Sequence, residues 1–269
     1  MLTLLISFIV GVGCFSAAYW AGDFGMGWSV TVALLAFGAS QVIATLLVQK
    51  RVRADMMRVQ GILTEGQKRI QVKMQRWQLR PPGSVQAAQK EILADTRVFV
   101  KEAIAETECL RRYRLWVPMI ERQIATAKMQ LHWMVKDFAA VDQLLPKALL
   151  VDPAMVAMKI ARMYMTNRPS DEIAKVYAKG VRRTRYNGNV LIAAVWSWIQ
   201  VQRNDADGAF KTLTEALRKS DNETLKRNHE LLMNNRVAHF SNSGLGDQWY
   251  SLQLEEPKVH VQRQRSVYR

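Results

Sequence analysis

The first 49 residues carry a single charged side chain, Asp23, which divides them into two apolar stretches. Each stretch is long enough to cross a membrane, because a hydrocarbon core about 30 Å thick needs about 20 residues of helix. The connection at residues 21–27 is short and rich in glycine, as a tight turn between antiparallel helices requires. The pattern therefore predicts a two-helix transmembrane hairpin over residues 1–49.

Positive charge begins where the second apolar stretch ends. The predicted turn holds no Lys or Arg, whereas four basic residues follow the stretch, at Lys50, Arg51, Arg53 and Arg58. Basic residues that flank a span stay on the cytoplasmic side, and we expect these four to lie at the membrane surface against anionic lipid headgroups. The charge asymmetry predicts a two-pass protein of the cell (inner, cytoplasmic) membrane with both termini in the cytoplasm.

Residues 50–83 have the pattern of a basic juxtamembrane amphipathic helix followed by a Pro/Gly linker. One apolar stripe follows this helix at heptad spacing and comprises Met56, Leu63, Ile70 and Trp77. Three interpretations fit the stripe: a helix on the membrane surface, a helix that pairs with a copy of itself, or a stalk packed on the soluble domain. We favour the stalk, since Gly61 and Gly66 weaken a long coiled coil.

A boundary follows at Arg80-Pro81-Pro82-Gly83, because proline cannot continue a helix and pushes the residue before it to extended geometry. A helical connector over residues 84–119 comes next, with Ser84 as its candidate N-cap. Its apolar face again has seven-residue spacing and comprises Val85, Ile92, Phe99, Ala103 and Leu110. We expect this helix to end near Arg114.

From residue 120 the apolar pattern changes to short helices with a period near 34 residues, expected over residues 120–256 together with a C-terminal cap. Three of these helices open at Lys136-Asp137-Phe138, Asp171-Glu172-Ile173 and Asp205-Ala206-Asp207. Positions 20, 24, 27 and 32 of the first 34-residue repeat hold Val141, Leu145, Ala148 and Pro153. The same positions hold Ala174, Ala178, Val181 and Tyr186 in the second repeat, and Ala209, Leu213, Ala216 and Asp221 in the third.

These positions resemble the tetratricopeptide (TPR) repeat family, whose antiparallel helix pairs carry small residues at positions 20 and 27 and a larger apolar residue at position 24. Small residues let neighbouring helices approach closely, while the larger residue fills the gap between units. The resemblance implies an all-α fold in which the transmembrane hairpin precedes a TPR-like α-solenoid of about three helix pairs. This architecture is similar to the HemY-type family of bacterial inner-membrane proteins.

In TPR arrays the first helices of successive units line a groove that receives peptides, so the resemblance implies a protein partner. Position 9 of the three units gives the predicted partner-binding residues Gln130, Tyr164 and Trp198. Beyond the repeats, we expect Trp249 and Tyr250 to pack onto the last unit and cover its apolar end. Residues 257–269 then form a basic tail.

A formal net charge of +15 suits an anionic membrane surface and would also suit nucleic acid. A second candidate surface is a basic edge formed by Arg182, Arg183 and Arg185, which fits acidic partners or lipid headgroups, although we favour a solvated helix end for these residues. No RNA- or DNA-binding motif accompanies the charge, so we place the membrane surface first and consider nucleic acid an unfavoured partner.

Candidate chemistry is sparse. The two cysteines, Cys14 and Cys109, are too few for a disulfide framework. No histidine spacing suggests a metal site, since the four residues lie far apart at His132, His229, His239 and His260. Without a cofactor loop or a nucleophile–base pair, we expect neither a cofactor nor enzymatic activity.

Three functional hypotheses remain. The first is a membrane-anchored scaffold or adaptor that presents a cytoplasm-facing TPR-like groove to a partner protein, within a larger envelope assembly. The second is a structural component that self-associates through the hairpin and the apolar stripe, with the repeats as spacers. The third is a membrane protein that binds nucleic acid through its basic surface.

Overall fold

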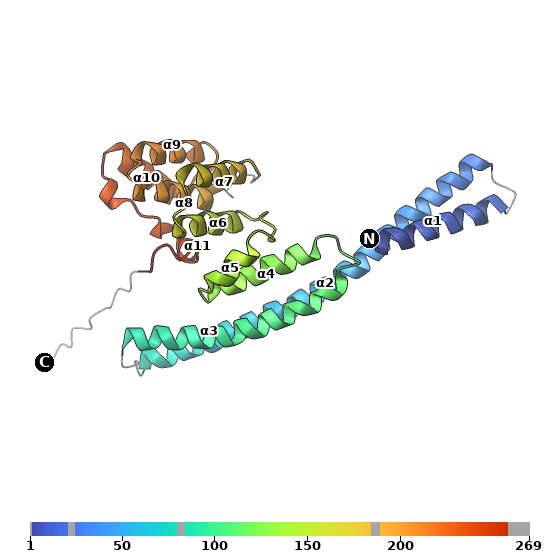
Figure 1. The fold of residues 1–269 in the computed structure, drawn as a ribbon, viewed down its shortest axis with the longest axis horizontal. Coiled ribbons are helices and arrows are strands. Elements are labelled where there is room, and N and C mark those ends of the chain that lie inside the picture. The colour runs from blue at the N-terminus through green and yellow to red at the C-terminus, as the bar shows by residue number, and fades with distance from the viewer. Residues whose placement is uncertain (1, 21–24, 80–83, 184–188, 258–269) are drawn as a thin grey trace. The chain divides into compact units, whose positions relative to one another are not determined.

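The computed structural model describes residues 2–20, 25–79, 84–183 and 189–257 (Figure 1). Within these ranges every regular element is a helix and no strand occurs, which confirms the all-α prediction. The chain divides into two compact units, residues 1–149 and 150–269.

Two apolar helices open the first unit. α1 (Leu2–Trp20) packs along the first part of α2 (Met26–Leu79), and by length and composition both are long and apolar enough to cross a membrane. Large apolar side chains point outward from the pair: Phe8, Leu34 and Leu35 are 65%, 66% and 69% exposed. Polar groups lie inside instead, where the Ser7 hydroxyl donates to Gln41 Oε1 at 2.9 Å. The predicted pair of apolar helices is therefore present; residues 21–24 of the predicted turn lie outside the described residues.

The second apolar helix continues past the expected border at Gln49. α2 is one helix of 54 residues, apolar in its first half and basic in its second. The helix continues through Lys50 to Leu79 because this segment is rich in strong helix formers and contains no proline. The apolar segment and the basic segment that follows it therefore belong to one continuous helix. The predicted terminator, Arg80-Pro81-Pro82-Gly83, lies outside the described residues.

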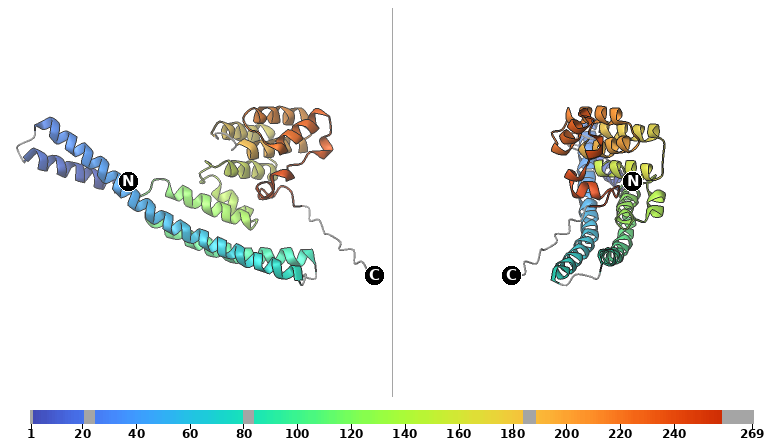
Figure 2. Two further views of the ribbon diagram at one scale, coloured as in Figure 1. Left: turned by 180° about the vertical axis from the view of Figure 1, so that it is seen from behind. Right: turned by 90° about the vertical axis from the view of Figure 1, so that its left-hand side faces the viewer.

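α3 (Val85–Thr107) runs back along the basic half of α2, as the two views in Figure 2 show. Ser84 is its N-cap as predicted, since the hydroxyl accepts from Ala87 N at 3.1 Å. The apolar stripe of α2 packs into this pair: Leu63 and Ile70 lie against the buried cluster that contains Phe99 of α3. At Leu63 and Ile70 the stripe is thus covered within the first unit.

The rest of the first unit folds over the middle of α2. The 3₁₀-helix η1 (Glu108–Tyr113) follows α3 where the sequence predicts a continued helix to Arg114, and α4 (Ile120–Met134) and α5 (Phe138–Leu144) come after it. A second buried cluster joins η1 and α4 to α2, with Leu110, Tyr113, Ile120 and Ile124 packed against Val48, Val52 and Met56. This cluster begins where the apolar half of α2 ends.

The second unit is built around α8. Its helices are α6 (Pro153–Met165), α7 (Ser170–Arg183), α8 (Asn189–Gln202), α9 (Ala206–Leu217) and α10 (Glu223–Met233), followed by η3 (Val237–His239), η4 (Ser243–Leu245) and α11 (Asp247–Tyr250). α8 contacts α6, α7 and α9, and each residue from Leu191 to Gln200 is buried. A helix that is apolar on all sides has no face for water and takes the centre of a unit.

One turn recurs in both units. α4, α6, α8 and α10 each end with a left-handed residue, at Lys136, Asn167, Asn204 and Asn235. In each case the next residue donates its backbone N–H to the carbonyl five positions earlier, as in Asp137 to His132 at 3.0 Å and Asp205 to Gln200 at 2.8 Å. This is the Schellman arrangement, which satisfies the last carbonyls of a helix. Asp137 and Asp205 then cap the following helices, which confirms two of the predicted helix starts.

The predicted repeat positions differ in burial. Val141, Ala209 and Leu213 are fully buried, as close packing between helices requires. Ala178, at position 24 of the second predicted repeat, is exposed. The TPR pattern expects a packed apolar residue at that position. Tyr186 lies outside the described residues.

Candidate functional site

The three predicted partner-binding residues fall into different surroundings. Gln130 is exposed on α4 in the first unit, Tyr164 is half-buried on α6, and Trp198 is 6% exposed on α8. Within the second unit, Tyr164 and Trp198 meet edge to face with ring centroids 5.3 Å apart. The structure therefore brings two of the three together, in an aromatic contact that fixes α6 against α8.

The C-terminal segment covers Trp198. Trp249 of α11 is fully buried and meets the Trp198 ring at 5.8 Å, which confirms that this residue packs back onto the last predicted unit. The Glu255 carboxylate accepts hydrogen bonds from both indoles, from Trp198 Nε1 at 2.7 Å and from Trp249 Nε1 at 2.8 Å. Tyr250 is half-buried, and residues 258–269 of the predicted tail lie outside the described residues.

The C-terminal segment therefore covers one of the predicted partner-binding residues, Trp198. Sequence reasoning missed Glu255, although an acidic pair at Glu255-Glu256 in a basic C-terminal region was a usable signal. At the other side of the aromatic contact, the Arg203 guanidinium lies 5.8 Å from the Tyr164 ring centroid and donates to Ser170 Oγ at 2.6 Å. The aromatic cluster is thus held from both sides, and Tyr164 keeps more exposed surface than Trp198.

The predicted basic residues lie on the surface. Lys50, Arg51, Arg53 and Arg58 are all exposed on α2, in the turns that follow its apolar half. Arg182 and Arg183 are exposed at the end of α7, while Arg185 lies outside the described residues. The described basic residues of both predicted surfaces are therefore accessible to solvent.

A buried carboxylate lies beside the first basic surface. The Asp55 side chain is 6% exposed and accepts hydrogen bonds from Tyr113 Oη at 2.8 Å and from Arg112, while Arg58 is 3.7 Å away. Burial raises the pKa of Asp55, but the hydrogen bonds from Arg112 and Tyr113 and the neighbouring positive charges outweigh it and leave that pKa below its usual range. Asp55 therefore stays ionised and joins α2 to η1.

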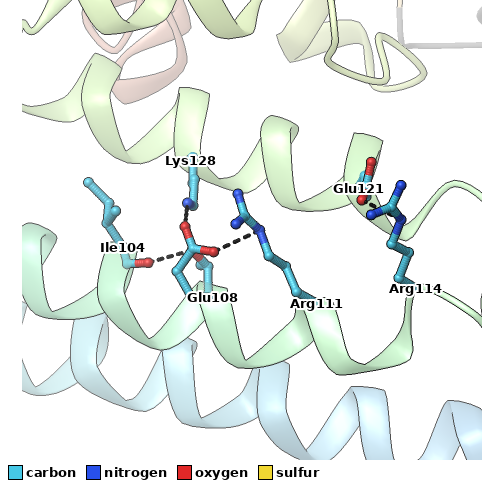
Figure 3. Close-up of polar contacts among 7 residues, drawn as sticks. Ile104, Glu108, Arg111, Arg114, Glu121 and Lys128 are labelled. Atoms are coloured by element: carbon cyan, nitrogen blue, oxygen red, sulfur yellow. Dashed lines mark hydrogen bonds and ion pairs between the residues drawn. The ribbon is translucent and has the colours of Figure 1, made fainter.

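η1 is fixed on its other side by ion pairs to α4, which Figure 3 draws. Glu108 accepts from Lys128 of α4 and from Arg111 at 2.8 Å, and Arg114 pairs with Glu121 at 2.9 Å. The hydrogen bond from Lys128 lowers the pKa of Glu108, so this carboxyl is also ionised. Since both faces of η1 are tied down, Arg112 holds a fixed place beside α2.

The result is a hollow of about 510 Å³ between α2 and the η1 region. It is lined by Arg51, Ala54, Asp55, Arg58, Arg112, Tyr113 and Trp116. Sequence reasoning found Arg51 and Arg58 but missed the residues from 112 to 116, because they reach α2 across 57 positions of sequence. The one signal was Asp55 itself, an isolated acid within a basic helix.

In the part of the chain that the structure describes, no three His, Cys, Asp or Glu side chains are grouped so that they would hold a metal ion. Cys14 and Cys109 are free thiols. No protein-family model matches the chain, and comparison with curated proteins and with solved structures gives no match either.

Proposed function

We propose that the protein is a membrane-anchored scaffold of the inner membrane that holds a partner protein through TPR-like helix pairs. In this proposal, α1 and the apolar half of α2 cross the bilayer as a hairpin and both termini are cytoplasmic. The observation that carries it is a pair of helices with large apolar side chains facing outward, continuous with a helical stalk and a helical bundle. Such a surface is stable in lipid and costly in water.

Two features support the TPR-like part of the proposal. α8 contacts the helix before it, the helix after it and α6, which is the neighbour pattern of stacked helix pairs. The same Schellman turn ends α4, α6 and α8, the first helices of the three predicted pairs, and it also ends α10, which follows them. The similarity to the HemY-type architecture belongs to this proposal as well.

The partner-binding face centres on Tyr164 rather than Trp198. Glu255 and Trp249 cover Trp198, whereas Tyr164 stays half-exposed on α6 and is held by Arg203. A rigid aromatic side chain at a partly exposed position is a typical interface anchor. A partner that displaced the C-terminal segment would gain access to Trp198 also.

Photo-cross-linking of the full chain in native membranes tests the proposal. A photoreactive aromatic residue replaces Tyr164, and the matched control carries it in place of Lys211, which is exposed on α9. We expect a discrete cross-linked partner from the Tyr164 position only. Identical products from both positions, or none from either, would contradict a partner-binding face at α6.

The self-associating structural component is the second candidate, and one observation favours it. Val72, Met74 and Val98 are 47%, 50% and 70% exposed on the α2–α3 stalk, where a second copy of the chain would cover them. Mass measurement of the protein in nanodiscs separates the two candidates. An oligomer that reverts to a monomer in a Val98→Lys variant would support the second candidate.

A further inference from the structure

The hollow beside Asp55 lies next to the start of the apolar hairpin. The backbone N–H of Leu2, the first described residue of α1, donates to the Leu115 carbonyl at 2.9 Å. Leu115 directly precedes Trp116, which lines the hollow. On α2, Arg51 lies two residues after Gln49, where the uncharged run ends. The hollow and one end of both apolar helices therefore occupy the same level of the first unit.

The charges of the hollow are unbalanced. Three arginines and one aspartate line it, a formal net charge of +2. Asp55 is fully engaged by Tyr113, Arg112 and Arg58, so it serves to position these side chains. Arg51 has no carboxylate partner in the described ranges, and the Arg58 and Arg112 side chains keep 68% and 56% of their surface exposed. Guanidinium donors therefore remain free to bind an anion.

We propose that this hollow binds the phosphate group of an anionic phospholipid headgroup through Arg51, Arg58 and Arg112, with Trp116 beside the glycerol region. Guanidinium groups form paired hydrogen bonds with phosphate oxygens. Tryptophan and tyrosine rings favour the headgroup level of a bilayer. The inference rests on the proposed hairpin, since that hairpin brings headgroups to the level of Arg51.

This site differs from a diffuse attraction between basic side chains and the membrane. Arg112 comes from η1, which is held against α4 by Lys128 and against α2 by Asp55. Two elements far apart in sequence thus converge on one hollow, and contacts within the first unit hold η1 beside α2. By contrast, Arg53 lies on the same helix turn as Arg51 but does not line the hollow, so it supplies a matched control.

The test uses the full-length protein in a non-ionic detergent, with lipid adducts measured by native mass spectrometry. Phosphatidylglycerol and phosphatidylcholine with the same acyl chains are compared, and inorganic phosphate is titrated in parallel. We expect the protein to prefer phosphatidylglycerol. We also expect Arg51→Gln and Arg112→Gln to weaken its binding about tenfold, since each removes a charge-assisted hydrogen bond. Arg53→Gln should weaken it clearly less than Arg51→Gln does, because Arg53 does not line the hollow and contributes only the general attraction of a basic side chain to anionic lipid.

Three results would overturn the inference. The first is an equal loss of phosphatidylglycerol binding in the Arg53→Gln and Arg51→Gln variants. The second is equal binding of phosphatidylglycerol and phosphatidylcholine. The third is an Arg51-dependent site that binds inorganic phosphate but not phosphatidylglycerol. Arg51→Gln keeps the test informative if Arg112→Gln misfolds, because Arg51 is exposed and holds no structural contact with Asp55. Resistance of the wild-type chain to alkaline extraction from membranes is measured separately. Extractable wild-type protein would contradict the proposed anchor, whereas anchored protein without lipid preference would contradict this site alone.

Discussion

Asp55 shows how one buried residue determines the place of its neighbours. Its carboxylate joins Tyr113 and Arg112 to α2, and its pKa lies below the usual range because hydrogen bonds and positive charges outweigh burial. A folded-state pKa below the unfolded value means that the charged form contributes stability above the unfolded pKa. This contribution is lost as the pH falls through the folded-state pKa.

We therefore predict that Asp55→Asn lowers the free energy of unfolding by about 1–2 kcal/mol near pH 7, a value reduced by the exposure of its arginine partners. The difference from wild type should shrink as the pH falls below about 4. Thermal unfolding of the detergent-solubilised chain, followed by circular dichroism across the acid range, measures it. A difference that is the same at every pH would contradict this role of the Asp55 charge.

Glu255 has a comparable role in the second unit, where it satisfies the N–H groups of Trp198 and Trp249. We predict that Glu255→Ala destabilises the protein by about 2–3 kcal/mol, because two indole donors lose their acceptor in a largely buried cluster. Glu256→Ala is the control, since Glu256 is exposed and should change stability by less than about 0.5 kcal/mol. Denaturant unfolding followed by tryptophan fluorescence compares them, and equal effects would exclude the proposed acceptor role.

At the scale of elements, the Phe99 side chain of α3 packs closely on α2 at Gly66. A Cβ atom there would lie 2.4 Å from ring carbons of Phe99, while one at Gly61 would meet nothing within 4 Å. We predict that Gly66→Ala destabilises the stalk by about 1–3 kcal/mol through overpacking. Gly61→Ala should stabilise the same helix by about 0.5–1 kcal/mol. Melting temperatures of the two variants in detergent should move in opposite directions, and a stabilised Gly66→Ala variant would show that the helices are not packed as described.

The sequence predicts elements better than it predicts contacts between them. Local patterns predict the two apolar helices and the packed stripe, since charge and proline act within a few residues. They also predict the helix caps at Ser84, Asp137 and Asp205, because capping is local too. The continuity of α2 through Gln49 was missed because an abrupt change in polarity need not end a helix. The covering of Trp198 by Glu255 was missed because nothing in the local pattern links positions 57 residues apart.

At the scale of the whole molecule, one continuous helix of the first unit, α2, carries both the apolar segment of the proposed hairpin and the basic segment that follows it. The hollow beside Asp55 lies where the apolar half of α2 meets its basic half. In the proposed function, the hairpin crosses the membrane and returns. The turn should then face outward, and the stalk and the helical units should share the cytoplasmic side.

Thiol labelling from each side of the membrane tests this claim most directly. A Cys14→Ser background leaves Cys109, which is exposed at η1, as the reporter for the stalk side. Gly25→Cys in a Cys14→Ser, Cys109→Ser background reports the turn, where Gly25 is exposed. With a membrane-impermeant reagent, we predict labelling of the Gly25→Cys thiol in intact cells and of Cys109 only in inverted membrane vesicles. Labelling of both thiols from the same side would contradict the transmembrane hairpin.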